Sequence, residues 1–140
     1  MLDLAMAAPS AAAQHSTLLA FDFGLKRTGV ASGNTLLDQA RPLQTISAGG
    51  EARFAPIAEL IKQWQPDALV VGVPVHPDGQ PHVNTRRAQR FARQLHGRFG
   101  LTVHEVDERY TTVEAVSHDA ADVDAASAAL ILEQFLRSTP

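Results

Sequence analysis

The sequence predicts an α/β fold in which helices flank a mixed five-stranded sheet. The chain has 140 residues, of which 45% are hydrophobic and 19% charged, as is ordinary for a folded domain with its own core. Its apolar patterns indicate the element order β-β-β-α-β-α-β-α. Residues 68–73 carry no polar side chain, which is typical of a strand covered on both faces. A meander followed by alternating helices and strands predicts antiparallel and parallel pairs in one sheet.

The first three strands form the predicted meander. Residues 17–23 are predicted to form an apolar strand in which Leu18, Ala20 and Asp22 share one face, and Asp22 falls near its end. Residues 24–27, Gly-Leu-Lys-Arg, are typical of a hairpin turn into a second strand over residues 28–33. A third strand is expected around residues 42–47 and would extend the antiparallel part of the sheet.

The rest of the chain alternates helices with strands. A helix that follows Gly49-Gly50 is expected to end near Gln65, where Pro66 stops it. After the apolar strand, the helix, strand and helix that complete the fold are expected over residues 84–99, 101–106 and 124–136. Residues 17–140 are therefore predicted to form a single domain.

Composition excludes several classes of protein. The chain has no cysteine, so disulfides, thiolate zinc sites and a cysteine nucleophile are excluded. No window approaches the roughly 18 apolar residues that a membrane span needs, so no membrane partner is expected. Residues 1–16 lack the basic start and continuous apolar stretch of a signal peptide, and we interpret them as a flexible leader. The cytoplasm is the expected location.

Charge is distributed unevenly along a chain whose formal net charge is only −3. The segment 82–100 contains five arginines and no acids: Arg86, Arg87, Arg90, Arg93 and Arg98. A solvated helix face opposite an apolar stripe is the commoner explanation of such a pattern. Exposed helices normally use opposite-charge pairs, however, and contacts with nucleic-acid phosphates would explain why these cations lack acidic neighbours.

Three acids fall near element boundaries, where α/β sheets place their ligand sites: Asp22, either Asp107 or Glu108, and Asp124. Converging carboxylates would repel one another unless a cation joined them, and hard oxygen ligands suit Mg²⁺ or Mn²⁺. Two such ions could support phosphodiester hydrolysis. Each acid also has a structural alternative: Asp124 could be only a helix N-cap, and Glu108 could pair with Arg109 on the surface.

Four motifs, in order, resemble the YqgF family of bacterial proteins, also called RuvX or Holliday-junction-resolvase-like: "LLAFDFGLKRTGVASG", "DALVVGVPVHPDGQ", "VHEVDERYTTVEA" and "DVDAASAALILEQFL". The resemblance implies an RNase H-like fold and a metal-dependent nuclease that matures the 5′ end of pre-16S ribosomal RNA. It implies that Asp22, Glu108 and Asp124 are catalytic and hold two Mg²⁺ or Mn²⁺ ions, with Asp107 as the alternative to Glu108. The residues expected to bind substrate phosphates are Lys26, Arg27, Arg87, Arg109 and Thr111.

The partner implied by this resemblance is structured RNA, free or in a pre-ribosomal particle. A second hypothesis is resolution of four-way DNA junctions, which would require a symmetric dimer, and nothing in the sequence specifies a dimer interface. A third is a non-catalytic nucleic-acid-binding module. The segment 115–121 is shorter than the family pattern, which favours this third hypothesis, whereas retention of the acids disfavours it.

Overall fold

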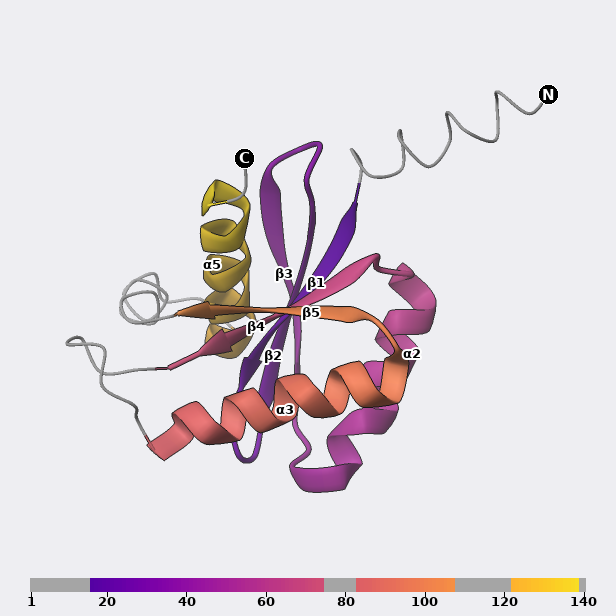
Figure 1. Ribbon diagram of the computed structural model, residues 1–140, viewed down its shortest axis with the longest axis vertical. Coiled ribbons are helices and arrows are strands. Elements are labelled where there is room, and N and C mark those ends of the chain that lie inside the picture. The colour runs from indigo at the N-terminus through magenta and orange to yellow at the C-terminus, as the bar shows by residue number, and fades with distance from the viewer. Residues whose placement is uncertain (1–15, 75–82, 108–121, 139–140) are drawn as a thin grey trace.

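The computed structural model describes residues 16–74, 83–107 and 122–138. It contains five strands, which are β1 (Thr17–Phe23), β2 (Thr28–Asn34), β3 (Gln39–Ile46), β4 (Ala68–Val73) and β5 (Thr102–Asp107). Its helices are the short 3₁₀ helix η1 (Gly50–Arg53) and the α-helices α2 (Phe54–Trp64), α3 (Val83–Phe99) and α5 (Val123–Ser138) (Figure 1).

The strands form one mixed sheet in the order β3-β2-β1-β4-β5. β1 pairs with β2, and β2 with β3, in antiparallel register, whereas β4 runs parallel to β1 and to β5. The predicted fold class and element order are therefore confirmed. Because β1, β4 and β5 are parallel, their carboxyl ends meet at one edge of the sheet, which is where ligand sites of such sheets lie.

β3 begins earlier than the sequence predicted, at Gln39 rather than near Pro42. Pro42 lies inside the strand, and proline cannot donate a hydrogen bond to the ladder. β3 is an edge strand, however, and its register with β2 shifts between Val30 and Ala31, opposite Pro42. An edge strand with a bulge tolerates proline, so Pro42 lies within the strand and does not mark its start.

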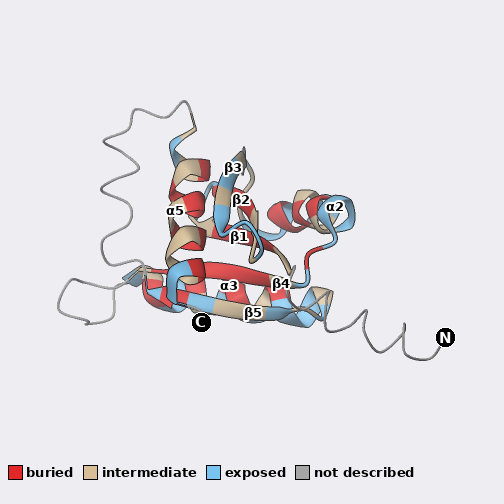
Figure 2. Ribbon diagram, turned by 90° about the horizontal axis from the view of Figure 1, so that it is seen from above, coloured by how far each residue is buried: buried red, intermediate tan, exposed pale blue. Residues whose placement is uncertain are grey.

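Helices cover both faces of the sheet (Figures 1 and 2). α2 and α3 cover one face, where Phe21, Leu69 and Phe91 belong to the larger cluster of buried side chains. α5 covers the other face, where Ala20 and Leu132 belong to a second cluster. Residues of β4 join both clusters, which explains the continuously apolar run and confirms that this strand is covered on both faces.

Two residues with positive φ angles mark the ends of the helical segment that connects β3 to β4. Gly50 has φ of 56° at the start of η1, and Gln65 adopts the left-handed conformation with φ of 48° at the end of α2. Gly50 and the following turn place Arg53 inside the protein rather than on its surface. No helix within the described residues is long and apolar enough to cross a membrane.

Candidate active site

Asp22 lies at the carboxyl end of β1, on the sheet face that α5 covers. Its direct partner across the antiparallel pair is Gly29 of β2. Burial raises the pKa of the Asp22 carboxyl from 3.8 to about 7, with a further contribution from the negative charge of Asp124. The Ser127 hydroxyl, which donates a hydrogen bond to Asp22, acts in the opposite direction. Asp22 is thus a desolvated acid beside a second acid, as the sequence suggested.

Gly29 allows α5 to bring Asp124 close to Asp22. A Cβ atom at Gly29 would lie 1.9 Å from the Asp124 carbonyl oxygen, so no side chain fits between β2 and the first turn of α5. Since Gly29 stands opposite Asp22 in the sheet, this close approach places the backbone of Asp124 directly over the Asp22–Gly29 pair. Two of the three predicted carboxylates therefore come together.

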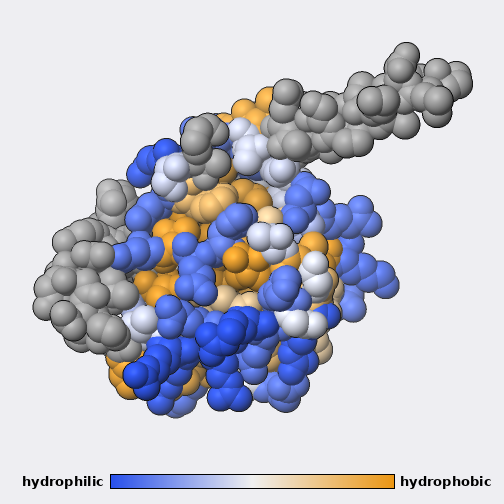
Figure 3. Space-filling model, viewed as in Figure 1, coloured by the Kyte–Doolittle hydropathy of each residue, from blue (hydrophilic) through white to orange (hydrophobic). Residues whose placement is uncertain are grey.

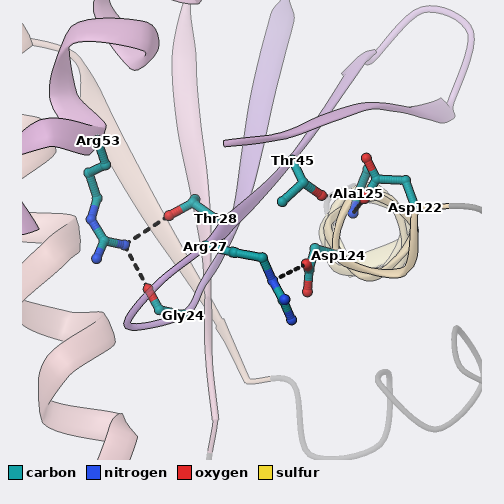
Figure 4. A network of polar contacts seen from close by, with 8 residues as sticks. All are labelled: Gly24, Arg27, Thr28, Thr45, Arg53, Asp122, Asp124 and Ala125. Carbon is teal, nitrogen blue, oxygen red and sulfur yellow. Dashed lines mark hydrogen bonds and ion pairs between the residues drawn. The ribbon is translucent and has the colours of Figure 1, made fainter. Parts of the chain in front are cut away.

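The N-cap of α5 is Asp122 and not Asp124. The Asp122 Oδ1 atom accepts a hydrogen bond from the backbone N–H of Ala125 at 3.0 Å, and it also accepts one from the hydroxyl of Thr45 on β3 (Figure 4). The alternative in which Asp124 serves only as a cap is therefore wrong. Asp122 fixes the start of α5 to β3, and the Asp124 carboxylate is left for other partners.

Arg27 is the cation that meets Asp124. Its Nε atom lies 2.9 Å from Asp124 Oδ2, with side chains that are 64% and 33% exposed respectively (Figure 4). Lys26, the preceding residue of the β1–β2 turn, is exposed. Of the two predicted phosphate-binding residues of the turn, Arg27 thus pairs with Asp124, whereas Lys26 is exposed and precedes it in the chain.

Arg53 holds the β1–β2 turn from the opposite side, and sequence reasoning missed it. Arg53 as a whole is only 3% exposed. Its guanidinium donates to the carbonyl oxygens of Gly24 at 2.8 Å, Leu25 at 2.9 Å and Gly50 at 3.2 Å, and to the Thr28 hydroxyl at 2.8 Å. Burial lowers the pKa of Arg53. Within the described ranges no carboxylate forms an ion pair with it, so its role is to satisfy backbone carbonyls and fix the turn.

The remaining predicted residues divide into two groups. Arg87 is exposed on α3, where it donates to Asn84 Oδ1 at 3.2 Å. The other three lie outside the described residues: Glu108, Arg109 and Thr111. Within residues 16–74, 83–107 and 122–138, no group of three acids or histidines is arranged to hold a metal ion.

Asp107, the alternative third acid, ends β5 opposite Val73 of β4. His104 of β5 stacks on Phe135 of α5, with ring centroids 4.8 Å apart, so even-numbered positions of the strand face α5. Because strand side chains alternate, Asp107 occupies a position on the opposite face, away from the acid pair. Its carbonyl oxygen nonetheless accepts a hydrogen bond from Gln134 of α5 at 3.0 Å.

Ser127 is the second residue that sequence reasoning missed, and here a signal was present. It follows Asp124 by three positions on the same helix, so both side chains lie on one face of α5, and its side chain is only 2% exposed. A small hydroxyl one turn after a candidate ligand, on the helix face that packs on the sheet, points to a hydrogen bond at the site.

The arrangement is an RNase H-like fold with an acid pair at the end of its first strand. The same fold occurs in the RuvC protein of Thermus thermophilus, solved in complex with a Holliday junction substrate, with a TM-score of 0.58. That likeness covers 89% of this chain and 95% of RuvC at 16% sequence identity, and it confirms the predicted fold.

Sequence comparison gives the family. Residues 16–138 match the family described as "RuvX: Holliday junction resolvase", and the chain belongs to it. A relative from Polaromonas is 63% identical over 134 residues, which cover 96% of this chain and 97% of the relative. Another from Albidiferax ferrireducens is 66% identical over 127 residues, covering 91% of this chain and 81% of the relative. Both relatives bear the name "Putative pre-16S rRNA nuclease".

Proposed function

We propose that this protein is a metal-dependent endonuclease that cuts the RNA backbone during maturation of the 5′ end of pre-16S ribosomal RNA. The observation that carries the proposal is the buried Asp22 carboxyl beside Asp124, in a chain whose relatives are named for this activity. A ribosomal precursor as substrate, free or in a pre-ribosomal particle, places the activity in the cytoplasm.

The acid pair fits a divalent metal. Asp22 and Asp124 offer hard oxygen donors, and the pKa of Asp22 is raised by burial and by the negative charge of Asp124, an arrangement that a divalent cation would relieve. Arg27, on an exposed side chain, compensates Asp124 alone. Mg²⁺ or Mn²⁺ prefers such ligands, and a pair of these ions would activate a water and stabilise the departing oxygen of the phosphodiester.

We assign Glu108 as the third carboxylate, in preference to Asp107. Asp107 occupies the α3 face of β5, whereas Asp22 and Asp124 lie on the α5 face. Glu108, which lies outside the described residues, is therefore assigned on the family motif, with the position of Asp107 on the other face as support.

The protein's own groups then have distinct parts in the reaction. Ser127 donates a hydrogen bond to Asp22 and holds its orientation. Arg27 and Lys26 bind the phosphate next to the bond that is cut, since both project from the turn that flanks the acid pair. Arg109 and Thr111 are proposed as further phosphate ligands on the basis of the family motif.

Resolution of four-way DNA junctions is the second candidate, because the RuvC protein with the same fold was solved on a Holliday junction. Junction resolution needs two active sites related by a two-fold axis, so this candidate requires a symmetric dimer. A DNA junction is therefore the second substrate in the cleavage experiment.

The test is cleavage of a labelled precursor RNA carrying the 16S 5′ leader, and of a DNA junction, with Mg²⁺, Mn²⁺ or a chelator. We expect wild type to cut the RNA with metal only, Asp22→Asn to be inactive, and the control Asp38→Asn, an exposed acid of the β2–β3 turn, to retain activity. Circular dichroism checks that each variant folds. Cleavage of a DNA junction but not of RNA would support the resolvase, and no cleavage despite salt-sensitive binding would support a binding module.

A further inference from the structure

A pocket of about 410 Å³ lies on the α3 side of the β1–β2 turn. Its apolar wall comes from Phe23, Leu25 and Phe54, and its polar wall includes Arg87, Arg90 and Gln94. Leu25 is 55% exposed although it is a large apolar side chain. A concave site with an apolar wall on one side and two cations on the other suits a ligand with a flat apolar part and an anionic part.

The pocket also contacts a buried positive charge. Arg53 lines it, and this side chain is almost fully buried, with hydrogen bonds to three carbonyl oxygens and one hydroxyl, all of them neutral groups. Arginine keeps its proton at neutral pH, even where burial lowers its pKa as it does for Arg53. A cation in a low-dielectric environment without a carboxylate partner in the described residues attracts anions more strongly than an exposed one.

The other charged groups leave this attraction uncompensated. Glu51 is the acid of the pocket lining, and both of its oxygens are held by Arg98 Nη2, at 2.5 and 2.7 Å. Arg87 and Arg90 are exposed and form no ion pair with an acid in the described part of the chain. Strongly hydrophilic side chains gather along α3 on the surface (Figure 3). The pocket is therefore net positive.

The pocket and the acid pair flank the same turn. Figure 4 shows Arg53 bound to one side of the β1–β2 turn and Arg27 paired with Asp124 on the other. Lys26, which is exposed, precedes Arg27 in this turn. A single nucleic-acid strand that crosses this turn would reach both places.

We infer that this pocket binds one nucleotide of the RNA strand on the far side of the β1–β2 turn from the acid pair. Arg87 and Arg90 bind its phosphate, and its base lies against Leu25 and the apolar wall. The inference rests on the proposed function, because it takes RNA as the ligand. It adds a second binding site, outside the acid pair, that fixes how the strand lies when the bond is cut.

The first experiment measures binding of a fluorescent single-stranded RNA oligonucleotide by anisotropy, with chelator present so that no cleavage occurs. The pocket variants are Arg87→Gln and Arg90→Gln, and the matched controls are Arg86→Gln and Arg93→Gln, on the same helix but outside this pocket. We expect the double pocket variant to bind about tenfold more weakly, because it can no longer form charge-assisted hydrogen bonds to the phosphate. Removal of one phosphate-binding cation also lowers the salt-dependence slope by about 0.7.

The second experiment separates the base from the phosphate. Leu25→Ser should weaken binding of RNA and leave binding of inorganic polyphosphate unchanged, because polyphosphate has no bases. The control is Leu37→Ser, another exposed leucine, which lies in the β2–β3 turn. If Leu25→Ser and Leu37→Ser behave alike, no base occupies the pocket and the inference is overturned.

The outcomes distinguish this inference from the proposed function. Equal losses of affinity in the pocket and control arginine variants would mean that α3 attracts RNA only as a general basic surface, which overturns the inference while cleavage by wild type still stands. If wild type cuts no RNA but the pocket variants alone bind RNA more weakly, the nuclease proposal fails and the pocket remains.

Discussion

The raised pKa of Asp22 predicts that this acid destabilises the metal-free protein above neutral pH. In the unfolded chain the carboxyl has its ordinary pKa of 3.8, whereas in the folded protein the value is about 7. Between these values the folded state retains a proton that the unfolded state has released, so the free energy of unfolding falls as pH rises. One pKa unit corresponds to about 1.36 kcal/mol, so a shift of about 3 units costs about 4 kcal/mol by pH 8.

Replacing Asp22 with Asn removes this titration and leaves an amide that still accepts a hydrogen bond from Ser127. We expect Asp22→Asn to be more stable than wild type at pH 8, by up to about 4 kcal/mol, and the difference to shrink by about 1.4 kcal/mol per pH unit below pH 7. Urea unfolding followed by circular dichroism, in chelator at pH 5 and pH 8, measures both stabilities.

Two further observations decide whether the reasoning holds. Mn²⁺ should stabilise wild type at pH 8 and have little effect on Asp22→Asn, since binding to the folded state alone raises its stability. The exposed-acid control Asp38→Asn should follow wild type at both pH values. The reasoning is refuted if wild type and Asp22→Asn show the same change in stability between pH 5 and pH 8.

The other contacts of the site give two more predictions. Gly29→Ala would put a Cβ atom 1.9 Å from the Asp124 carbonyl oxygen, far below an ordinary contact distance. It should therefore cost about 1–3 kcal/mol of stability and abolish RNA cleavage. The control is Gly97→Ala, whose Cβ atom would meet nothing within 4 Å. Normal cleavage by Gly29→Ala would show that the close approach is not needed. Arg27→Gln should tighten Mn²⁺ binding by about twofold to fivefold, because Arg27 and the metal compete for the Asp124 carboxylate and an exposed ion pair is worth about that much. Isothermal titration calorimetry measures the affinity, with Arg41→Gln as the control. An affinity that falls, or that changes equally in Arg41→Gln, contradicts this competition.

Local patterns explain most of what the sequence predicted correctly. The apolar runs of β1 and β4 placed both strands at the residues observed. Asp22 stood out as a single acid near the end of such a strand, and the structure brings it close to Asp124. The acid-free arginine run likewise marked α3 and its exposed face.

Contacts between distant residues explain what the sequence did not reveal. The N-cap Asp122 also accepts a hydrogen bond from Thr45, which lies 77 positions away in the chain, so its connection to β3 could not be recognised from neighbouring residues. Arg53 gave no signal, because its partners at Gly24 and Leu25 are close only after η1 has turned the chain back toward β1. A buried arginine is rare, and burial depends on the whole fold rather than on neighbouring residues.

The β1–β2 turn is the element on which the site depends, because it has a fixed partner on each side. Arg53 binds its carbonyl oxygens from the α3 side, and the Arg27–Asp124 ion pair connects it to α5 on the other. The buried contact with Arg53 does not involve the acid pair, so the turn would stay fixed if the proposed substrate phosphate drew Arg27 away from Asp124. The exposed ion pair can therefore exchange partners while the backbone that carries Arg27 and Lys26 keeps its place. This division between a buried, permanent contact and an exposed, exchangeable one is what a site that binds and releases a charged strand requires.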